Sequence, residues 1–501
     1  MIILKPIFEE ERLGILKEHG IDIPHYCWRD GVKIYLNAND EYPIMVLQVE
    51  ELLGKIKIKK SFIQSIDGNK IHIKGKYKNK TIDEVRINKT FQEELDYKTR
   101  KRLNKLIGQH VKMTIGFLND HTEGQTRISI SGGKDSSVMN FLFKRWVLPK
   151  LKNKEFVYDG FNTTNDVADT YKQMYKEGLT KDNINNPLIY INDEAYEKMI
   201  KAGFKEENFI IKGKKKYYHL GWYQWIEFVK EWWIPNALKR GCCSTYKEGQ
   251  IKLILDKNKK YNILTGVRKY ESAKRADYEF NIVEAIKKTK GESYLNLPKL
   301  WDRIAPICYM TDVDVWLIIL MYKLDINNMY KYGFERVGCL CCPYASPYTN
   351  LLIKYYYPKQ WGRWMNVLKN NYTLKNVKPR LKWSYEEYSE GGKWRTGMSK
   401  EYEILSKKKT KDRIKELADL KGISEAMAEK YWDKKCDCGK KLNPDEIAMN
   451  YKLFGRYEDI SANEDNRQLY CKKCMCKKLG ITSKEYTEKV MEFRAQGCEL
   501  F

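Results

Sequence analysis

The sequence predicts an α/β protein built around a doubly wound, mostly parallel sheet, with a small β-rich module before it and a helical, cysteine-rich region after it. Three observations support this fold class. A short alternating strand at 127–130 runs into the glycine turn S-G-G-K-D-S at 131–136, and an apolar helical stretch follows. Two more strand patterns, near 156–161 and 261–265, end in polar or glycine-containing loops. Lysine-alternating segments precede this part and cysteine pairs follow it.

The 501-residue chain has 43% hydrophobic and 32% charged residues, which is typical of a globular protein with several domains. Its net charge is +26, from 92 Lys plus Arg against 66 Asp plus Glu. Such an excess favours a polyanionic partner, either DNA or tRNA, and a solvated lysine-rich surface explains it equally well. No apolar run approaches the length of a membrane span and no secretory leader is visible, so we expect a cytoplasmic protein.

We expect four parts along the chain. Residues 1–85 form a small α+β module, in which 55–63 and 70–77 alternate as I-K-I-K and I-H-I-K and predict a hairpin or a small β-rich unit around Asp67 and Gly68. Residues 86–345 form the nucleotide domain, with a helical lead-in at 90–117. Residues 346–430 are predicted to be a helical basic region, and 431–501 a cysteine-rich module resembling a zinc ribbon.

The glycine turn predicts a phosphate site. Free backbone N–H groups at a strand, turn and helix start point towards bound phosphate oxygens. Lys134 adds a positive charge, and Asp135 is suited to hold a hydroxyl, an amide or Mg²⁺. The loop is not a Walker A motif, because Asp135 rather than Ser or Thr follows the lysine. The predicted nucleotide-binding residues of the loop are Ser131, Gly132, Gly133, Lys134, Asp135 and Ser136.

Two further loops are expected at the same edge of the sheet, where doubly wound folds bind ligands. Thr163 and Thr164 follow the strand at 156–161, while Gly266 and Arg268 follow the strand that starts at Tyr261. The guanidinium of Arg268 offers a fork of donors that matches phosphate or sulfate oxygens. We therefore predict that all four contact the nucleotide, and that Lys134, Asp135 and Arg268 are catalytic. Thr311 is predicted to cap an architectural helix.

The first cysteine group predicts an iron–sulfur site. Cys242 and Cys243 are adjacent, and Cys339 and Cys342 form a C-x-x-C pair that is followed by proline. Four thiolates from two loops suit a [4Fe-4S] cluster, whereas adjacent cysteines suit zinc poorly. Cys341 is an alternative ligand.

The second group predicts a structural zinc site. Cys436 and Cys438 form a C-x-C knuckle, and Cys471 and Cys474 form a C-x-x-C knuckle. The alternatives are Cys476 as a replacement ligand, or reduced thiols that bind nothing. Cys498, near the end of the chain, is either a catalytic thiol or an ordinary cysteine.

Taken in order from Ser131 to Pro343, these motifs resemble the phosphoadenosine phosphosulfate (PAPS) reductase family of PP-loop enzymes. The shared landmarks are the S-G-G-K-D-S loop, G-V-R-K-Y-E-S at 266–272 and T-D-V-D-V-W at 311–316. The paired cysteines are similar to those of adenylyl-sulfate reductases and DndC-like DNA phosphorothioation proteins. The resemblance implies an adenine nucleotide alpha-hydrolase-like fold that binds ATP or an adenylyl nucleotide.

Three functions follow as hypotheses. The first is an ATP-dependent sulfurtransferase that acts on a nucleic acid and receives sulfur from a donor protein. The second is a reductase that converts adenylyl sulfate or PAPS to sulfite, although Cys498 lies in a different context from the family's Glu-Cys-Gly. The third is a nucleotide-sensing, nucleic-acid-binding regulator without turnover.

Overall fold

The computed structural model describes residues 4–67, 70–73, 76–77, 80–81, 84–86, 90–237, 241–272, 275–290, 298, 300–374, 377–422, 424–425, 428–429, 432, 436, 438–454 and 469–495. The chain divides into two compact units, Met1–Val377 with Ser384–Gly397, and Lys378–Trp383 with Met398–Phe501. The first unit therefore contains both the N-terminal module and the predicted nucleotide domain. The boundaries expected near residues 85, 345 and 430 stay a prediction.

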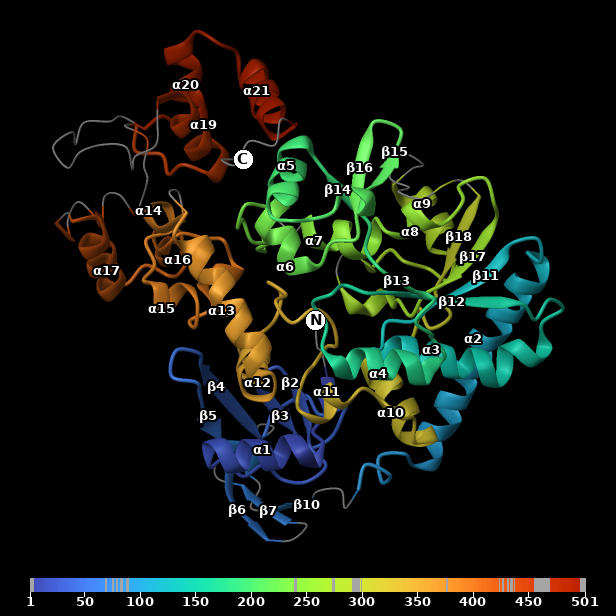
Figure 1. Cartoon of the computed structure of the whole chain (residues 1–501). Helices are drawn as coiled ribbons and strands as arrows, with labels where there is room; N and C mark the ends of the chain where they lie inside the picture. The colour runs from blue at the N-terminus through green and yellow to red at the C-terminus, as the bar shows by residue number, and fades with distance from the viewer. Residues whose placement is uncertain are drawn as a thin grey trace. The chain divides into compact units, whose positions relative to one another are not determined.

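A five-stranded parallel sheet forms the centre of the first unit and confirms the predicted α/β fold (Figure 1). Its spatial order is β13 (Ile184–Asn185), β12 (Phe156–Phe161), β11 (Gln125–Ser129), β17 (Tyr261–Leu264) and β18 (Trp301–Ile304), with every neighbouring pair parallel. β11, which leads into the glycine loop, is the middle strand. The loops after β11, β12 and β17 consequently meet at one edge.

Helices cover both faces of this sheet. On one face Ile128 and Leu264 belong to the main hydrophobic core, together with apolar side chains of α2, α3 and α10. On the other face Ile263 and Trp301 pack with Ile251 of α8. The helices of this region are α2 (Tyr97–Asp120), α3 (Lys134–Leu142), α4 (Ala168–Glu177), α5 (Asp193–Lys201), α6 (Trp222–Gln224), α7 (Gly241–Cys243), α8 (Ile251–Ile254), α9 (Ile282–Lys290), α10 (Asp312–Tyr322) and α11 (Asn328–Lys331).

The start of α10 has the predicted cap. Thr311 Oγ1 accepts a hydrogen bond from the backbone N–H of Asp314 at 3.2 Å, and Asp314 Oδ2 accepts one from the N–H of Thr311 at 2.9 Å. This reciprocal capping box satisfies two backbone donors that the helix leaves without partners. It fixes the first turn of α10, which includes Asp312, at the edge of the sheet.

A second, antiparallel sheet lies between β13 and α6 along the chain. It consists of β14 (Ile189–Ile191), β16 (Lys215–Tyr218) and β15 (Ile210–Lys212), in that order. β15 and β16 form a hairpin whose tip contains Gly213, which adopts a positive φ of 60°. The ring of Tyr218, in β16, contacts the rings of Phe204 and Phe209.

The N-terminal module is a separate antiparallel structure, as expected. Its main sheet has the order β1 (Leu4–Pro6), β2 (Trp28–Asp30), β3 (Lys33–Tyr35), β4 (Met45–Glu50) and β5 (Lys55–Ser61), and α1 (Glu9–His19) follows β1. A smaller sheet contains β10 (Glu84–Arg86), β7 (Lys70–Ile73) and β6 (Ile63–Asp67), and β8 (Lys76–Tyr77) pairs with β9 (Lys80–Thr81). The predicted hairpin is therefore β6 with β7, whereas β5 pairs with β4.

Buried charges join the N-terminal module to the nucleotide domain. Arg29 is fully buried, and its guanidinium contacts Glu11 Oε1 at 2.8 Å, Glu335 Oε1 at 2.6 Å and the carbonyl oxygen of Gly333 at 2.5 Å. Lys5 makes a further ion pair with Glu11. Breaking a buried pair of this kind leaves an uncompensated charge, which costs about 3–5 kcal/mol. The network therefore holds residues 333–335 firmly against the module.

The remaining described helices follow the cysteine loop at 339–342. The first unit contains α12 (Pro347–Tyr356), α13 (Pro358–Tyr372) and α15 (Tyr385–Tyr388), and α14 (Val377–Leu381) begins at its boundary. The second unit contains α16 (Lys400–Leu405), α17 (Lys411–Lys421), α19 (Pro444–Phe454), α20 (Lys472–Leu479) and α21 (Ser483–Ala495). Among the described residues, no helix combines the length and apolar character needed to span a bilayer.

Candidate functional site

The glycine loop connects β11 to α3, and glycines permit two close backbone contacts there. Gly132 has a φ of 68°, and a Cβ atom there would lie 2.8 Å from the carbonyl oxygen of Thr170. Gly266, after β17, lies so close to the loop that a Cβ atom would be 2.8 Å from the backbone nitrogen of Ser136. Only glycine permits both approaches without movement of the backbone. These glycines thus pack the ends of two strands around the start of α3.

Four charged side chains meet at this edge, of which Lys134 and Arg268 are buried and Asp135 and Asp312 are half-buried. Lys134 Nζ lies 3.0 Å from Asp135 Oδ2 and 2.8 Å from Asp312 Oδ1. Arg268 contacts the same two carboxylates, with Nε 2.6 Å from Asp135 Oδ1 and Nη2 2.5 Å from Asp312 Oδ1. The structure therefore brings together the three predicted catalytic residues and adds Asp312 as a fourth member.

The charged forms of this network stabilise one another. Burial acts to lower the pKa of Lys134, but the carboxylates of Asp135 and Asp312 outweigh it and raise the pKa above its ordinary value. Burial acts to raise the pKa of Asp135, and Lys134 with Arg268 reverses the direction and lowers it. Two cations thus remain charged in a largely dry site, which is the environment in which phosphate or sulfate oxygens are bound strongly.

A cavity of about 860 Å³ opens over the network. The predicted residues that line it are Ser131, Gly133, Lys134, Asp135, Ser136, Gly266 and Arg268. Ser244 and Lys247, which follow the paired cysteines, and Arg336 and Val337, which precede Cys339, line it as well. Its volume is within the range of pockets that hold small ligands and cofactors. The glycine loop and both cysteine segments therefore border a single space.

Two residues of this site were not predicted. Asp312 was expected only as part of a helix cap, although its position after β18 at the same sheet edge is a usable signal. Tyr330 accepts a hydrogen bond from the backbone N–H of Lys134 at 3.0 Å through its phenol oxygen. Burial raises the pKa of Tyr330 to about 12, so the phenol stays protonated. No sequence pattern pointed to this tyrosine.

Thr163 and Thr164 lie away from the lining of the cavity. The Thr164 hydroxyl accepts a hydrogen bond from the backbone N–H of Trp222 at 2.6 Å. Thr163 contacts Asp166, and its hydroxyl also interacts with the Cys339 thiol. The carbonyl oxygen of Asn165 accepts from the N–H of Leu340 at 2.8 Å. This loop therefore supports the cysteine segment instead of lining the nucleotide cavity.

The first cysteine group gathers around Cys242. The pKa of the Cys242 thiol is raised by a hydrogen bond with Cys243, by burial, and by the negative charges of Cys243, Cys339 and Cys342. All four predicted ligands therefore lie within electrostatic reach of one another. Cys341 is buried beside Tyr223, whose hydroxyl is 3.8 Å from its sulfur.

The surroundings of these thiols fit an anionic cluster. The charge of Cys339 is the main cause that raises the pKa of the nearby Lys247, which keeps this lysine cationic. The carboxylate of Asp166 also helps to raise the pKa of Lys247. The donor set thus fits the predicted [4Fe-4S] group.

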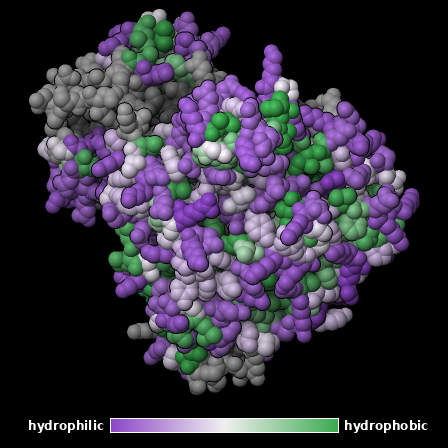
Figure 2. All heavy atoms as spheres, viewed as in Figure 1, coloured by the Kyte–Doolittle hydropathy of each residue, from purple (hydrophilic) through white to green (hydrophobic). Residues whose placement is uncertain are grey.

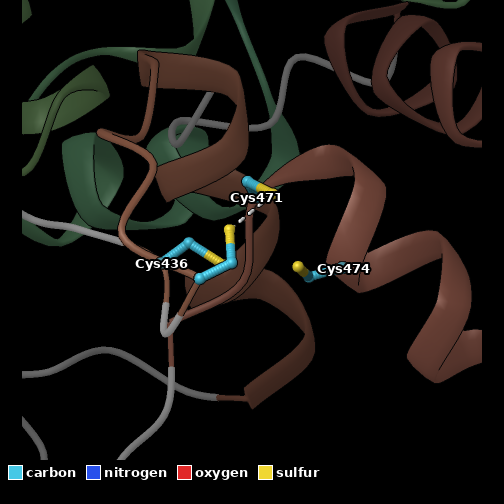
Figure 3. A group of neighbouring side chains, drawn as sticks. Cys436, Cys471 and Cys474 are labelled. Atoms are coloured by element: carbon cyan, nitrogen blue, oxygen red, sulfur yellow. Dashed lines mark hydrogen bonds between the residues drawn. The ribbon is translucent and has the colours of Figure 1, made fainter.

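The second unit contains a compact four-thiol site (Figure 3). The Sγ atoms of Cys436, Cys438, Cys471 and Cys474 all lie within 4.8 Å of one another. Figure 3 shows Cys471 and Cys474 at the start of α20, facing Cys436 on the opposite loop. The backbone N–H of Lys440 lowers the pKa of Cys438 to about 7, with help from the neighbouring thiols. Four convergent thiols with N–H donors are typical of a closed metal site.

The two remaining cysteine predictions have different outcomes. Cys476 is not a member of the four-thiol group, and its thiol donates to the carbonyl oxygen of Thr482 at 3.7 Å. The structure therefore places the C-x-C and C-x-x-C knuckles together without it. Cys498 lies outside the described residues, and its predicted roles stay open.

The parallel sheet, the glycine loop at the helix start and the paired cations define a PP-loop type of nucleotide-binding domain. Residues 125–345 match the protein-family model described as phosphoadenosine phosphosulfate reductase domain, and this stretch is a domain of that family. The match confirms the resemblance on which the sequence interpretation rested.

Two curated relatives come from Methanocaldococcus jannaschii. The chain is 32% identical over 145 residues to Uncharacterized protein MJ0066, and the match covers 28% of this chain and 28% of the relative. It is 27% identical over 243 residues to Uncharacterized protein MJ0973, which covers 48% of this chain and 47% of the relative. The matched regions thus span half or less of the length of these relatives.

Two solved structures are also similar to parts of the chain. One is PAPS reductase from Candida auris in a phosphate complex, with 14% identity, a TM-score of 0.28, and coverage of 49% of this chain and 95% of that one. The other is FMN adenylyltransferase from Candida glabrata with FMN and an ATP analogue, with 11% identity, a TM-score of 0.24, and coverage of 47% and 65%.

Proposed function

We propose that this protein binds ATP or an adenylyl nucleotide at the glycine loop and transfers sulfur to an acceptor, with a nucleic acid as the acceptor class. The observation that carries the proposal is the shared cavity. Lys134 and Arg268 line the same space as Ser244 and Lys247 beside the paired cysteines, and Val337 before Cys339. A nucleotide held by the first group would have its reacting end close to the second.

The four residues of the charge network would have different roles in this reaction. Lys134 and Arg268 would bind the phosphate oxygens and stabilise the charge that develops on the leaving pyrophosphate. Asp135 and Asp312 contact both cations and would hold them in place, and Asp135 would also be suited to hold a hydroxyl, an amide or Mg²⁺. The acceptor oxygen would form a bond to the α-phosphorus of ATP while the bond to the β-phosphate oxygen breaks, and pyrophosphate takes the electron pair. A hydrosulfide-class nucleophile would then displace AMP from the activated atom.

Cys242, Cys243, Cys339 and Cys342 would hold the [4Fe-4S] group, which would supply electrons or relay sulfur when bound. Lys247 would offset the negative charge of the ligated thiolates. In the second unit, Cys436, Cys438, Cys471 and Cys474 would hold structural Zn²⁺. The lysine excess of the whole chain, with a net charge of +26, supports a nucleic-acid partner.

A second candidate is reduction of adenylyl sulfate or PAPS to sulfite. The match of residues 125–345 to the PAPS reductase domain favours it. The forked guanidinium of Arg268 next to the ammonium of Lys134 would serve a sulfate group as well as a phosphate.

Anaerobic purification with iron, sulfide and zinc analysis, followed by product assays, tests these proposals. Pyrophosphate and AMP released from ATP support the sulfurtransferase, and sulfite released from PAPS supports the reductase. Absence of both would indicate a binding protein without turnover. Cys242→Ser is expected to lose iron, whereas the matched control Cys308→Ser, a buried cysteine outside the group, is expected to retain it. Equal iron in both variants, or none in the wild-type protein, would contradict the cluster.

A further inference from the structure

We propose that the exposed face of the β14–β16–β15 sheet is a platform for a single-stranded nucleic acid. The inference rests on the proposed function, because it names the surface that would hold the acceptor. Its defining residues, here called the tyrosine platform, are Tyr190, Tyr217, Lys212, Lys214 and Lys215. Figure 2 shows apolar and hydrophilic side chains mixed over β15 and β16.

The pairing of the strands decides which side chains share this face. Tyr190 of β14 is directly opposite Tyr217 of β16, and Lys215 is directly opposite Lys212 of β15. Residues two apart on a strand point to the same side, so Lys215 and Tyr217 share one face. Ile189 and Ile191 are buried on the opposite face, whereas Tyr190 is 51% exposed. The tyrosines therefore project from the solvent side of the sheet.

The two rings offer surfaces on which bases stack. Their centroids are 6.0 Å apart in an edge-to-face arrangement, so each keeps part of its ring available. Lys212 Nζ lies 6.0 Å from the centroid of the Tyr217 ring. Aromatic side chains on an open sheet bind unstacked bases, because every base has a flat face and needs no specific hydrogen bond. A duplex keeps its bases stacked on one another and cannot use such rings.

The lysines provide the charge that a phosphate backbone requires. Lys212, Lys214 and Lys215 are exposed around the turn at Gly213, and no acidic side chain pairs with them in the part of the chain that the structure describes. Lys216 differs, because it points to the other face, where it pairs with Asp193 at 2.7 Å and covers the ring of Tyr196. Three exposed cations beside two aromatic rings match alternating phosphates and bases.

The platform is connected to the wall of the nucleotide cavity. Gln250 Oε1 accepts a hydrogen bond from the N–H of Leu188 at 2.9 Å, and Gln250 Nε2 donates to the carbonyl oxygen of Leu188 at 3.2 Å. Leu188 immediately precedes β14, while Gly249 and Ile251, on either side of Gln250, line the cavity. A strand bound on the platform would therefore lie next to the segment that follows Cys242 and Cys243.

The test is fluorescence anisotropy with a labelled single-stranded oligonucleotide over a range of salt concentrations, using the full chain. Tyr190→Ala with Tyr217→Ala is expected to weaken binding by at least about tenfold, with an unchanged salt slope. Tyr190→Phe with Tyr217→Phe should bind like the wild type, because the rings remain. Replacement of Lys212, Lys214 and Lys215 by Ala should reduce the slope of log K against log salt by about 2, since each phosphate contact contributes about 0.7.

A matched charge control is available in β5. Lys55, Lys59 and Lys60 are exposed without an acidic partner among the described residues, and their replacement by Ala removes the same charge from a strand that lacks the tyrosine pair. This variant should bind the oligonucleotide nearly as well as the wild type. Wild-type affinity in the tyrosine-to-alanine variant, equal binding of a duplex, or no binding by the wild-type protein would overturn the platform. ATP turnover, measured separately in each variant, shows whether the proposed nucleotide chemistry fails independently.

Discussion

Removal of the Lys134 charge tests whether Lys134, Asp135, Arg268 and Asp312 act as one network. Lys134 is 4% exposed and contacts two carboxylates, so Lys134→Met leaves Asp135 and Asp312 with Arg268 as their only cation in this network. Removing one partner from a buried ion pair costs about 3–5 kcal/mol. We expect the lower end, about 3 kcal/mol, because Arg268 still contacts both carboxylates. For the first unit, Met1–Val377 with Ser384–Gly397, an unfolding entropy of about 2.1 cal/mol/K per residue converts this loss into a fall in Tm of about 4 °C.

A second substitution should reverse part of this loss. Lys134→Met combined with Asp312→Asn removes one positive and one negative charge and keeps the pair between Arg268 and Asp135. Residues in one buried network couple by about 0.5–3 kcal/mol, so the double variant should be more stable than Lys134→Met. Both variants should bind ATP more weakly than the wild type, because the phosphate-binding ammonium is gone.

Thermal unfolding of the nucleotide-free protein and equilibrium ATP binding supply the two measurements. Arg127→Met is the matched control, because Arg127 makes a bidentate pair with Asp159 at 2.6 Å on the same sheet but does not line the cavity. It should lose stability and keep its affinity for ATP. If the double variant is as unstable as Lys134→Met, the four groups do not form one network; if Lys134→Met binds ATP normally, the loop is misassigned.

Two further predictions concern acid and metal. Lys134 and Arg268 hold the pKa of Asp135 below its ordinary value of 3.8 against the effect of burial, so the ionised carboxylate stabilises the fold above about pH 4 and this contribution is lost as the pH falls through the folded-state pKa. Asp135→Asn should therefore lose less unfolding free energy, relative to the wild type, at about pH 3 than at about pH 7. A loss that is larger at about pH 3 would refute the ion pairing of Asp135 with Lys134 and Arg268. In the second unit, Cys438→Ser should lose zinc and unfold at a lower temperature, whereas Cys476→Ser should retain zinc; equal metal content in both would refute the four-ligand site.

The parallel sheet was predictable because its strands carry short apolar runs and end in loops of unusual composition. Strands near 127, 156 and 261 were placed from this pattern, and β11, β12 and β17 confirm them. The N-terminal pairing was harder to predict. The alternating segments 55–63 and 70–77 have the same period, and nothing local distinguishes β5, which joins β4, from β6, which joins β7. Strand partners are decided by the core that they cover, which a local pattern does not contain.

The proximity of Lys134 to Arg268 was predictable from topology, since neighbouring parallel strands end at the same edge of the sheet. The same argument predicted nucleotide contacts for Thr163 and Thr164, but it fixes only where β12 ends, not the direction in which its loop then folds. That loop contacts the segment around Leu340, far away in the sequence. Asp312 was not predicted as a site residue, because the favourable interaction with the helix dipole already explains a carboxylate in the first turn of a helix.

The buried charges of the N-terminal module explain why it belongs to the nucleotide unit. Arg29 holds Gly333 and Glu335, which lie between Tyr330 at the glycine loop and Cys339 at the cysteine loop. A desolvated guanidinium with two carboxylate partners and two carbonyl partners is costly to disrupt, so this short segment is fixed on one side by the module and on the other by the sheet. The position of Cys339 relative to the glycine loop thus depends on Arg29, which lies 306 positions before its partner Glu335 in the sequence.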